Sequence, residues 1–196
     1  MYLIFDVSGT EKPKEYKANF SDIHLWPKLV HVSWILLDKD LKPIEDFDYI
    51  VNKEDRAYSS AVMNFAKIDD EDIEKKGKPI LEILEKFNES LEKCNYVIAH
   101  NININSNILA AEYLRNTVDV KIFKKESICI MHEGTYITKL PTKYGTFKWP
   151  SLVELHAALF NSTFTPPNNA RADVIASARC FIKMMRAGHL EDLFEE

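Results

Sequence analysis

The spacing of the apolar residues changes between residues 51 and 79, and this change constrains the fold most. Before it, three apolar runs at residues 2–7, 29–37 and 47–51 are too short for helices and rich in β-forming residues. The turn sequence DKDLKP separates the second run from the third. The first part of the chain is therefore predicted to be an antiparallel meander of three strands.

After the change, apolar residues recur at helical spacing. In residues 79–94 they fall on one helical face, and Pro79 suits the first turn. We expect a strand over Tyr96–Ala99, with further helices over 106–115, 151–160 and 172–187 and short extended segments over 118–123 and 127–131. The expectation is an α/β domain over residues 1–196, with a mixed five-stranded sheet, part meander and part parallel, flanked by helices.

Composition narrows the class of protein. Hydrophobic residues make up 46% and charged residues 28%, which is typical of a globular chain. Cys94, Cys129 and Cys180 form no CxxC pair, so reduced thiols in a cytoplasmic protein are expected and a zinc site is not. The start lacks a signal-peptide pattern, and no apolar run suits a membrane span. The net charge of −5 argues against bulk coating of duplex DNA.

Four segments, taken in order, resemble the motifs of the DnaQ-like (DEDD) 3′→5′ exonucleases, which have the RNase H-like fold. They are FDVSGT, then WPKLVHVSWILLD with IDDEDIEKKGKPILEILEKF, then VIAHNININSNIL, and last FKWPSLVELHAALF leading into PPNNARADVIASARCF. The resemblance covers about 180 residues, nearly the whole chain. It implies the family's chemistry, in which clustered carboxylates hold two Mg²⁺ or Mn²⁺ ions and a histidine acts as general base.

The family's catalytic positions are only partly kept. Asp6 and Asp173 stand where the family has aspartates and remain as the candidate metal ligands, whereas Ser8 replaces a glutamate, Asn105 an aspartate and Asn168 the general-base histidine. Ala66 also stands where many relatives have a histidine. We expect weak or absent Mg²⁺ or Mn²⁺ binding and no efficient cleavage, since both the ligand charge and the base are lost.

The binding groove implied by the resemblance could remain. Its candidate contacts to a single-stranded DNA or RNA 3′ end are Ser8, Gly9, Thr10, His100, Asn101, Lys148 and Trp149. Lys148 and Trp149 belong to residues 139–150, where lysines alternate with aromatic residues, as suits single-stranded nucleic acid. A solvated loop in which Trp149 anchors the next helix is the favoured explanation of this segment, and Arg171 and Arg179 suit ion pairs as well as phosphate.

Alternatives stay open at this point. Glu11 could replace the missing carboxylate, and His132 or His156 the missing base. The chain could be an inactive nuclease that binds nucleic acid or a protein partner in the old groove. It could also be an active exonuclease, an engineered inactive form of one, or a protein-interaction scaffold. The ending GHLEDLFEE faintly resembles peptides that bind sliding clamps, but a final amphipathic turn is the expectation.

Overall fold

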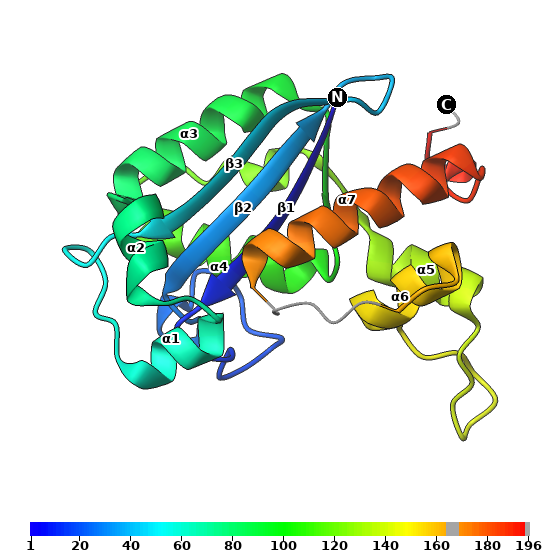
Figure 1. Ribbon diagram of the computed structural model, residues 1–196, viewed down its shortest axis with the longest axis horizontal. Coiled ribbons are helices and arrows are strands. Elements are labelled where there is room, and N and C mark those ends of the chain that lie inside the picture. The colour runs from blue at the N-terminus through cyan, green and yellow to red at the C-terminus, as the bar shows by residue number, and fades with distance from the viewer. Residues whose placement is uncertain (164–168, 195–196) are drawn as a thin grey trace.

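A six-stranded sheet forms the centre of the molecule (Figure 1). The computed structural model describes residues 1–163 and 169–194. In chain order the strands are β1 (Tyr2–Gly9), β2 (Leu29–Leu37), β3 (Pro43–Val51), β4 (Gly77–Lys78), β5 (Tyr96–Ala99) and β6 (Glu126–Cys129). Their order in the sheet is β4-β3-β2-β1-β5-β6. The predicted mixed α/β sheet is confirmed, with one strand more than expected because the two-residue β4 carries no apolar pattern.

The sheet is partly antiparallel and partly parallel. β1, β2 and β3 form the predicted meander, with Asp6 opposite Ser33 and Ser33 opposite Asp48. β5 pairs in parallel with β1 and with β6, while β4 pairs in parallel with β3. The register of β1 against β2 shifts between Ser8 and Gly9, so β1 ends in an irregularity of the kind that redirects side chains beside functional sites.

Helices cover both faces of the sheet. They are α1 (Ser60–Ala66), α2 (Asp70–Lys76), α3 (Ile80–Lys93), α4 (Ile102–Arg115), α5 (Ile130–Thr138), α6 (Leu152–Phe160) and α7 (Ala170–Arg186), with short 3₁₀ turns η1 (Ile23–Leu25), η2 (Ile122–Lys124) and η3 (Glu191–Leu193). Figure 1 shows α7 crossing the sheet on the side toward the viewer. None of the described helices is long and apolar enough to cross a membrane.

Side chains that alternate along β1 divide the core into two layers. Leu3 and Phe5 pack with apolar residues of α3 and α4. Ile4 packs on the opposite face with residues of α6 and α7. Asp6 and Ser8 share the alternation of Ile4, so the first candidate site residues lie on the α7 side of the sheet.

Helix α4 begins earlier than predicted. Asn105 and Ser106, at the predicted start, are buried inside the helix, and its N-cap is Asn101, whose φ of 65° lies in the left-handed region. Asparagine tolerates this conformation better than most residues, so the tight turn after β5 can form. This turn brings Asn105 toward the end of β1.

The segment 118–123 is not the extended strand that its β-branched residues suggested. Val118 and Val120 pack against the core, and Ile122 begins the 3₁₀ turn η2. No strand of the described chain pairs with this segment, so its local preference for extended backbone is not realised. The segment 127–131 is divided instead, since β6 ends at Cys129 and α5 begins at Ile130.

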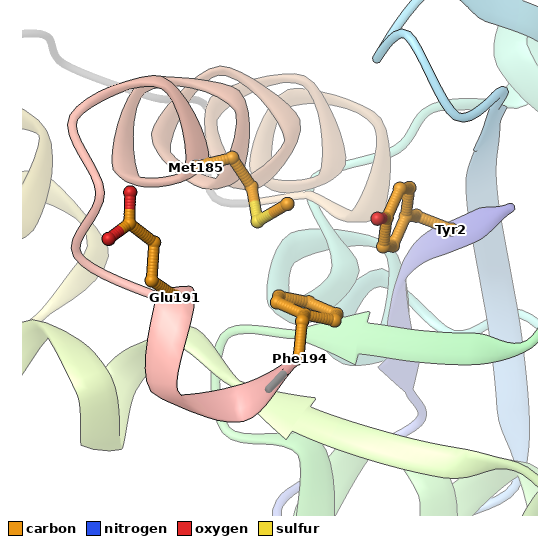
Figure 2. Close-up of a pocket in the computed structure, with 4 residues that line it drawn as sticks. All are labelled: Tyr2, Met185, Glu191 and Phe194. Atoms are coloured by element: carbon orange, nitrogen blue, oxygen red, sulfur yellow. The ribbon is translucent and has the colours of Figure 1, made fainter. Parts of the chain in front are cut away.

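The C-terminal segment folds back onto the beginning of β1. Helix α7 is followed by Gly188 at φ 75°, the predicted helix-ending position, and the chain then turns into η3. Figure 2 shows Phe194 and Met185 beside Tyr2 around a pocket of about 270 Å³. The Phe194 ring lies edge-on to Tyr2 at 5.8 Å and to Tyr96 at 5.0 Å. Phe194 is therefore part of the fold, as expected for a final amphipathic turn.

Candidate active-site groove

The end of β1 and the start of α7 together form a groove of about 350 Å³. Of the predicted site residues, it contains Asp6, Ser8, Gly9, Asn101 and Asp173. These positions come from three segments that are far apart in the sequence. Its other lining residues include Glu11, Lys12, Pro13, Tyr16, Phe65, Ile104 and Ile108. The fold thus gathers five of the eleven predicted site positions at one place.

Close backbone packing explains the glycine at the end of β1. A Cβ atom at Gly9 would lie 2.7 Å from Cγ of Pro27, well inside contact distance. Thr10 continues past this point, and its backbone N–H donates to the Lys28 carbonyl at 2.9 Å. Thr10 lines an adjoining depression with Glu11, Lys12 and Phe65 rather than the groove itself. The strand end is therefore shaped by packing as much as by any ligand.

Asp173 reaches the groove from the first turn of α7. Asn169 caps this helix by accepting from the Ala172 N–H at 2.9 Å. Arg171 pairs with Asp46 of β3, with Nη2 donating to Oδ2 at 2.9 Å, so this arginine is an ion-pair residue that joins α7 to the sheet. The guanidinium of Arg179 lies 5.0 Å from the Phe160 ring centre, outside the groove lining.

Both aspartates sit in surroundings that disfavour negative charge. Burial raises the pKa of the Asp173 carboxyl to about 6. Burial raises the pKa of Asp6 well above its usual range, and the nearby Asp173 carboxylate adds to that rise, while the hydrogen bond from Asn105 opposes it. Raised pKa values in a cleft are typical of functional sites. The two carboxylates are thus electrostatically coupled.

Asn105 is held in one orientation by four hydrogen bonds. Its side-chain oxygen accepts from the backbone N–H of Val7 at 3.0 Å. Its NH₂ group donates to Oδ1 of Asp6 at 3.2 Å and to the carbonyl oxygens of His100 at 3.0 Å and Asn101 at 3.4 Å. The reverse orientation would place the amide oxygen against three acceptors. Asn105 therefore presents a donor, and no free oxygen, toward Asp6.

The residues present do not fit a two-metal site. Such a site needs several oxygen ligands with negative charge. Within residues 1–163 and 169–194, no three His, Cys, Asp or Glu side chains lie close enough together to hold a metal ion. Ser8 is uncharged, and the Asn105 oxygen is engaged with Val7. Asp6 and Asp173 are thus the two family ligands that remain.

The replacement residues considered from the sequence have different places. Glu11 does line the groove with Asp6 and Asp173. His132 contacts Trp149 with tilted rings whose centres are 4.7 Å apart, and His156 is buried against Phe160. Neither histidine is among the described residues that line the groove. Ala66, the last residue of α1, is fully buried in an apolar cluster of the core. Asn168 lies outside the residues that the structure describes.

Three predicted nucleic-acid contacts lie beside the groove rather than in it. The His100 ring faces Pro150, with Nε2 at 3.0 Å from the carbonyl oxygen, and burial lowers the pKa of this histidine. Lys148 and Trp149 precede Pro150 and are exposed. Tyr16 and Phe65, in contrast, line the groove and were not identified from the sequence. Their signal was weak, being isolated aromatic residues within polar stretches.

The arrangement of strands and helices is the expected RNase H-like fold, which this chain shares with solved structures of exonuclease I. Escherichia coli exonuclease I in complex with a dA16 oligonucleotide matches with a TM-score of 0.69 and 14% identity, over 98% of this chain and 42% of that chain. A zinc-bound form of E. coli exonuclease I with single-stranded DNA matches with a TM-score of 0.67 and 15% identity, over 98% and 42%.

A second exonuclease I provides a further match. The moderately thermophilic exonuclease I from Methylocaldum szegediense gives a TM-score of 0.66 and 15% identity, over 94% of this chain and 40% of that chain. This chain therefore spans less than half the length of these matched structures. No family model matches it, and no curated protein sequence does. At such identities the likeness establishes the fold.

Proposed function

We propose that this protein binds the 3′ end of single-stranded DNA or RNA in the groove and does not cleave it efficiently. The observation that carries the proposal is the orientation of Asn105, whose amide donates to Asp6 where the family has a carboxylate ligand. A donor aimed at a ligand position excludes a cation from the space between them. In this proposal the groove still binds a strand but lacks the ligand charge of the family's site.

The expected loss of cleavage has two independent causes. Replacing two carboxylates by Ser8 and Asn105 removes attraction for a divalent cation, on the order of several kcal/mol for each close pair in a partly buried site. Asn168 cannot act as a base, and loss of general-base catalysis reduces rates by about 10²–10⁴-fold. Weak or absent binding of Mg²⁺ or Mn²⁺ follows.

Binding of nucleic acid is supported by the groove walls. Tyr16 is 54% exposed and Phe65 43% exposed, so both offer ring surface on which a base could stack. Lys12 adds a cation beside them. Structures with this fold are complexes of exonuclease I with single-stranded oligonucleotides. These features favour a single strand over a duplex, which exposes no ring faces for stacking.

A nuclease assay tests the proposal directly. The protein is incubated with 5′-labelled single-stranded DNA or RNA and Mn²⁺, and binding is measured in parallel by fluorescence anisotropy in EDTA. We expect binding without shortening of the strand; a ladder of shortened products would contradict the proposal. The combined variant Ser8→Glu, Asn105→Asp, Asn168→His should gain Mn²⁺-dependent shortening if only the ligands and base are missing.

An active exonuclease is the second candidate, favoured by one observation: Glu11 lines the groove with Asp6 and Asp173. If Glu11 completes a metal site, the unaltered protein should shorten the labelled strand, and Glu11→Gln should abolish this. Glu15→Gln is the matched control, because Glu15 lies in the same loop, is exposed and accepts only from the local Lys17 N–H at 2.9 Å.

The proposal treats residues 1–196 as one domain acting in the cytoplasm. The cysteines support a location in the cytoplasm: Cys94, Cys129 and Cys180 are free, buried thiols, which suit a reducing compartment. A protein partner in the groove is the competing scaffold function. It would predict that the groove variant Asp173→Arg leaves nucleic-acid binding unchanged while abolishing capture of that partner.

A further inference from the structure

A well-formed hairpin projects from the molecule between α5 and α6. Pro141 and Phe147 form an antiparallel bridge, and the Lys148 N–H donates to the Leu140 carbonyl at 2.9 Å. At the tip, the Thr142 N–H donates to the Thr146 carbonyl at 2.7 Å, and Gly145 adopts φ 78°. Residues 139–149, here called the hairpin, therefore hold a defined shape without support from the core.

The hairpin and the end of α5 expose an unusual amount of aromatic surface. Tyr136 is 73% exposed, Tyr144 79%, Phe147 45% and Trp149 63%. Elsewhere along the described chain, exposed large apolar residues are spaced singly. Soluble proteins seldom expose several aromatic rings together unless the rings contact a partner. The rings thus mark an interaction surface.

The charge of this surface is opposite to that of the chain. Residues 136–149 contain three lysines and no acidic residue, whereas the whole chain carries a net charge of −5. Lys143 Nζ lies 4.9 Å from the centre of the Tyr144 ring. Lys148 pairs with Glu154 at 2.6 Å, which leaves Lys139 and Lys143 as the exposed cations available to a ligand. Cations beside open aromatic faces are complementary to a single strand, with its phosphates and unstacked bases.

The end of the hairpin lies close to the turn that contributes Asn101 to the groove. Pro150, the residue after Trp149, accepts the 3.0 Å contact from the His100 ring. Asn101, the residue after His100, lines the groove. The Trp149 ring also contacts His132 of α5, with the two rings tilted at 39° to each other. A strand that leaves the groove past Asn101 would therefore meet Trp149 next.

We infer that the hairpin is a second binding surface for single-stranded nucleic acid, on which bases upstream of the 3′ end stack. This inference rests on the proposed function of the groove and adds to it the length of strand that is recognised. Tyr144 and Trp149 provide the stacking faces, while Lys139 and Lys143 contact phosphates. Short oligonucleotides should fill the groove alone, and longer ones should reach the hairpin.

Oligonucleotide length separates the two surfaces. Anisotropy is measured in EDTA with oligothymidylates of about four and about 20 nucleotides, since single-strand site sizes run from about 4 to 16 nucleotides. The double variant Tyr144→Ala, Trp149→Ala should weaken binding of the longer strand roughly 10- to 100-fold, given typical base-stacking strengths. Its affinity for the short strand should match that of the unaltered protein. Lys139→Ala with Lys143→Ala should reduce the salt dependence of long-strand binding.

Phe123→Ala is the matched control, because Phe123 is 48% exposed but lies outside the hairpin against Phe20. Unchanged long-strand affinity in the double variant would overturn the hairpin inference and leave the groove proposal intact. Equal losses for both lengths would also overturn it, by placing these residues in the groove's own binding. If the unaltered protein binds neither strand, the proposed function and this inference both fail.

Sedimentation analysis tests whether the hairpin instead binds a second copy of this chain. We expect the unaltered protein and the double variant to sediment alike. A dimer that the double variant abolishes, with strand binding unaffected, would instead assign the hairpin to self-association.

Discussion

The side-chain NH₂ of Asn105 donates to Oδ1 of Asp6 at 3.2 Å, across 99 residues of sequence. The same amide also bonds to the backbone of β1 and of the turn before α4. In a nuclease with a carboxylate at this position, a cation would separate the two acids. Here a hydrogen bond joins Asn105 directly to Asp6, so side chains of the protein itself organise the site.

Replacing this amide by a carboxylate should destabilise the protein. Asn105→Asp removes the donors to Asp6 and to the His100 carbonyl and places two acids in contact, which should lower the free energy of unfolding by about 1–3 kcal/mol. Urea unfolding in EDTA measures the loss. Asn103→Asp is the control, since Asn103 is exposed on the same helix and should change stability little. Equal stability of both variants would mean that the hydrogen bonds around Asn105 contribute nothing.

Divalent cations should stabilise the unaltered protein only slightly. A cation present at a concentration equal to its Kd adds about 0.4 kcal/mol, which corresponds to no more than about 1.5 °C in Tm. The double variant Ser8→Glu, Asn105→Asp should gain several degrees when Mn²⁺ is added, because two ligands return. Differential scanning fluorimetry with Mn²⁺ and with EDTA compares them. A large Mn²⁺ shift in the unaltered protein would show that a full ligand set already exists.

The stability of the protein should fall as the pH rises from about 4 to about 6. The folded-state pKa of Asp173 is raised to about 6, so the folded form binds the proton more tightly than the unfolded form does. That preference stabilises the fold below the unfolded pKa and is lost as pH rises through the folded pKa. Asp6 acts in the same direction. Denaturation midpoints across this range measure the slope.

Asp173→Asn should remove part of this slope and stabilise the fold at neutral pH by about 1–2 kcal/mol. Asp119→Asn is the control, because Asp119 is an exposed partner of Lys124 and should change stability by less than about 0.5 kcal/mol. A slope unaffected by Asp173→Asn would place the titrating group elsewhere. Asp48 does not contribute to this pH dependence of stability, since its pKa is lowered to about 2 and it titrates only at more acid pH.

Glu112 should be among the residues least tolerant of substitution. Its buried carboxylate accepts from Arg56 at 2.6 Å, from Arg115 at 3.0 Å and from the Leu29 N–H at 3.0 Å. Glu112→Ala leaves the buried Arg56 without its partner and should cost about 3–5 kcal/mol of stability. Glu85→Ala, at an exposed position on α3, is the comparison in urea unfolding. A small loss at Glu112 would show that water replaces the carboxylate.

The sequence was sufficient for the meander and the main helices because their signals are local. Short apolar runs rich in β-forming residues identify β1 to β3, and Pro79 with the Ile80 face identifies α3. The prediction of an extended segment over 118–123 was wrong because β-branched residues favour a strand only where a neighbouring strand is present to pair with. The start of α4 was predicted too late because the left-handed conformation of Asn101 depends on the turn around it.

The candidate site was predictable only through the resemblance of ordered motifs. It placed Asp6, Asn105 and Asp173 together, which no local spacing could do. The orientation of the Asn105 amide was not predictable, since it depends on the Val7 N–H and on two carbonyl groups. Tyr16 and Phe65 were missed because a groove wall made from a loop and a short helix leaves no periodic pattern.

The packing of Phe194 on Tyr2 has a practical consequence for handling the molecule. Tyr2 begins β1 and Ser8 lies near its other end, so the two positions are separated by roughly 20 Å along the strand. Residues 2 and 194 thus meet on the side remote from the groove. A tether attached beside residue 2 or residue 194 leaves the groove facing away from a sensor surface. A short flexible linker joining these ends, with the chain reopened at the hairpin tip, is a feasible circular permutation.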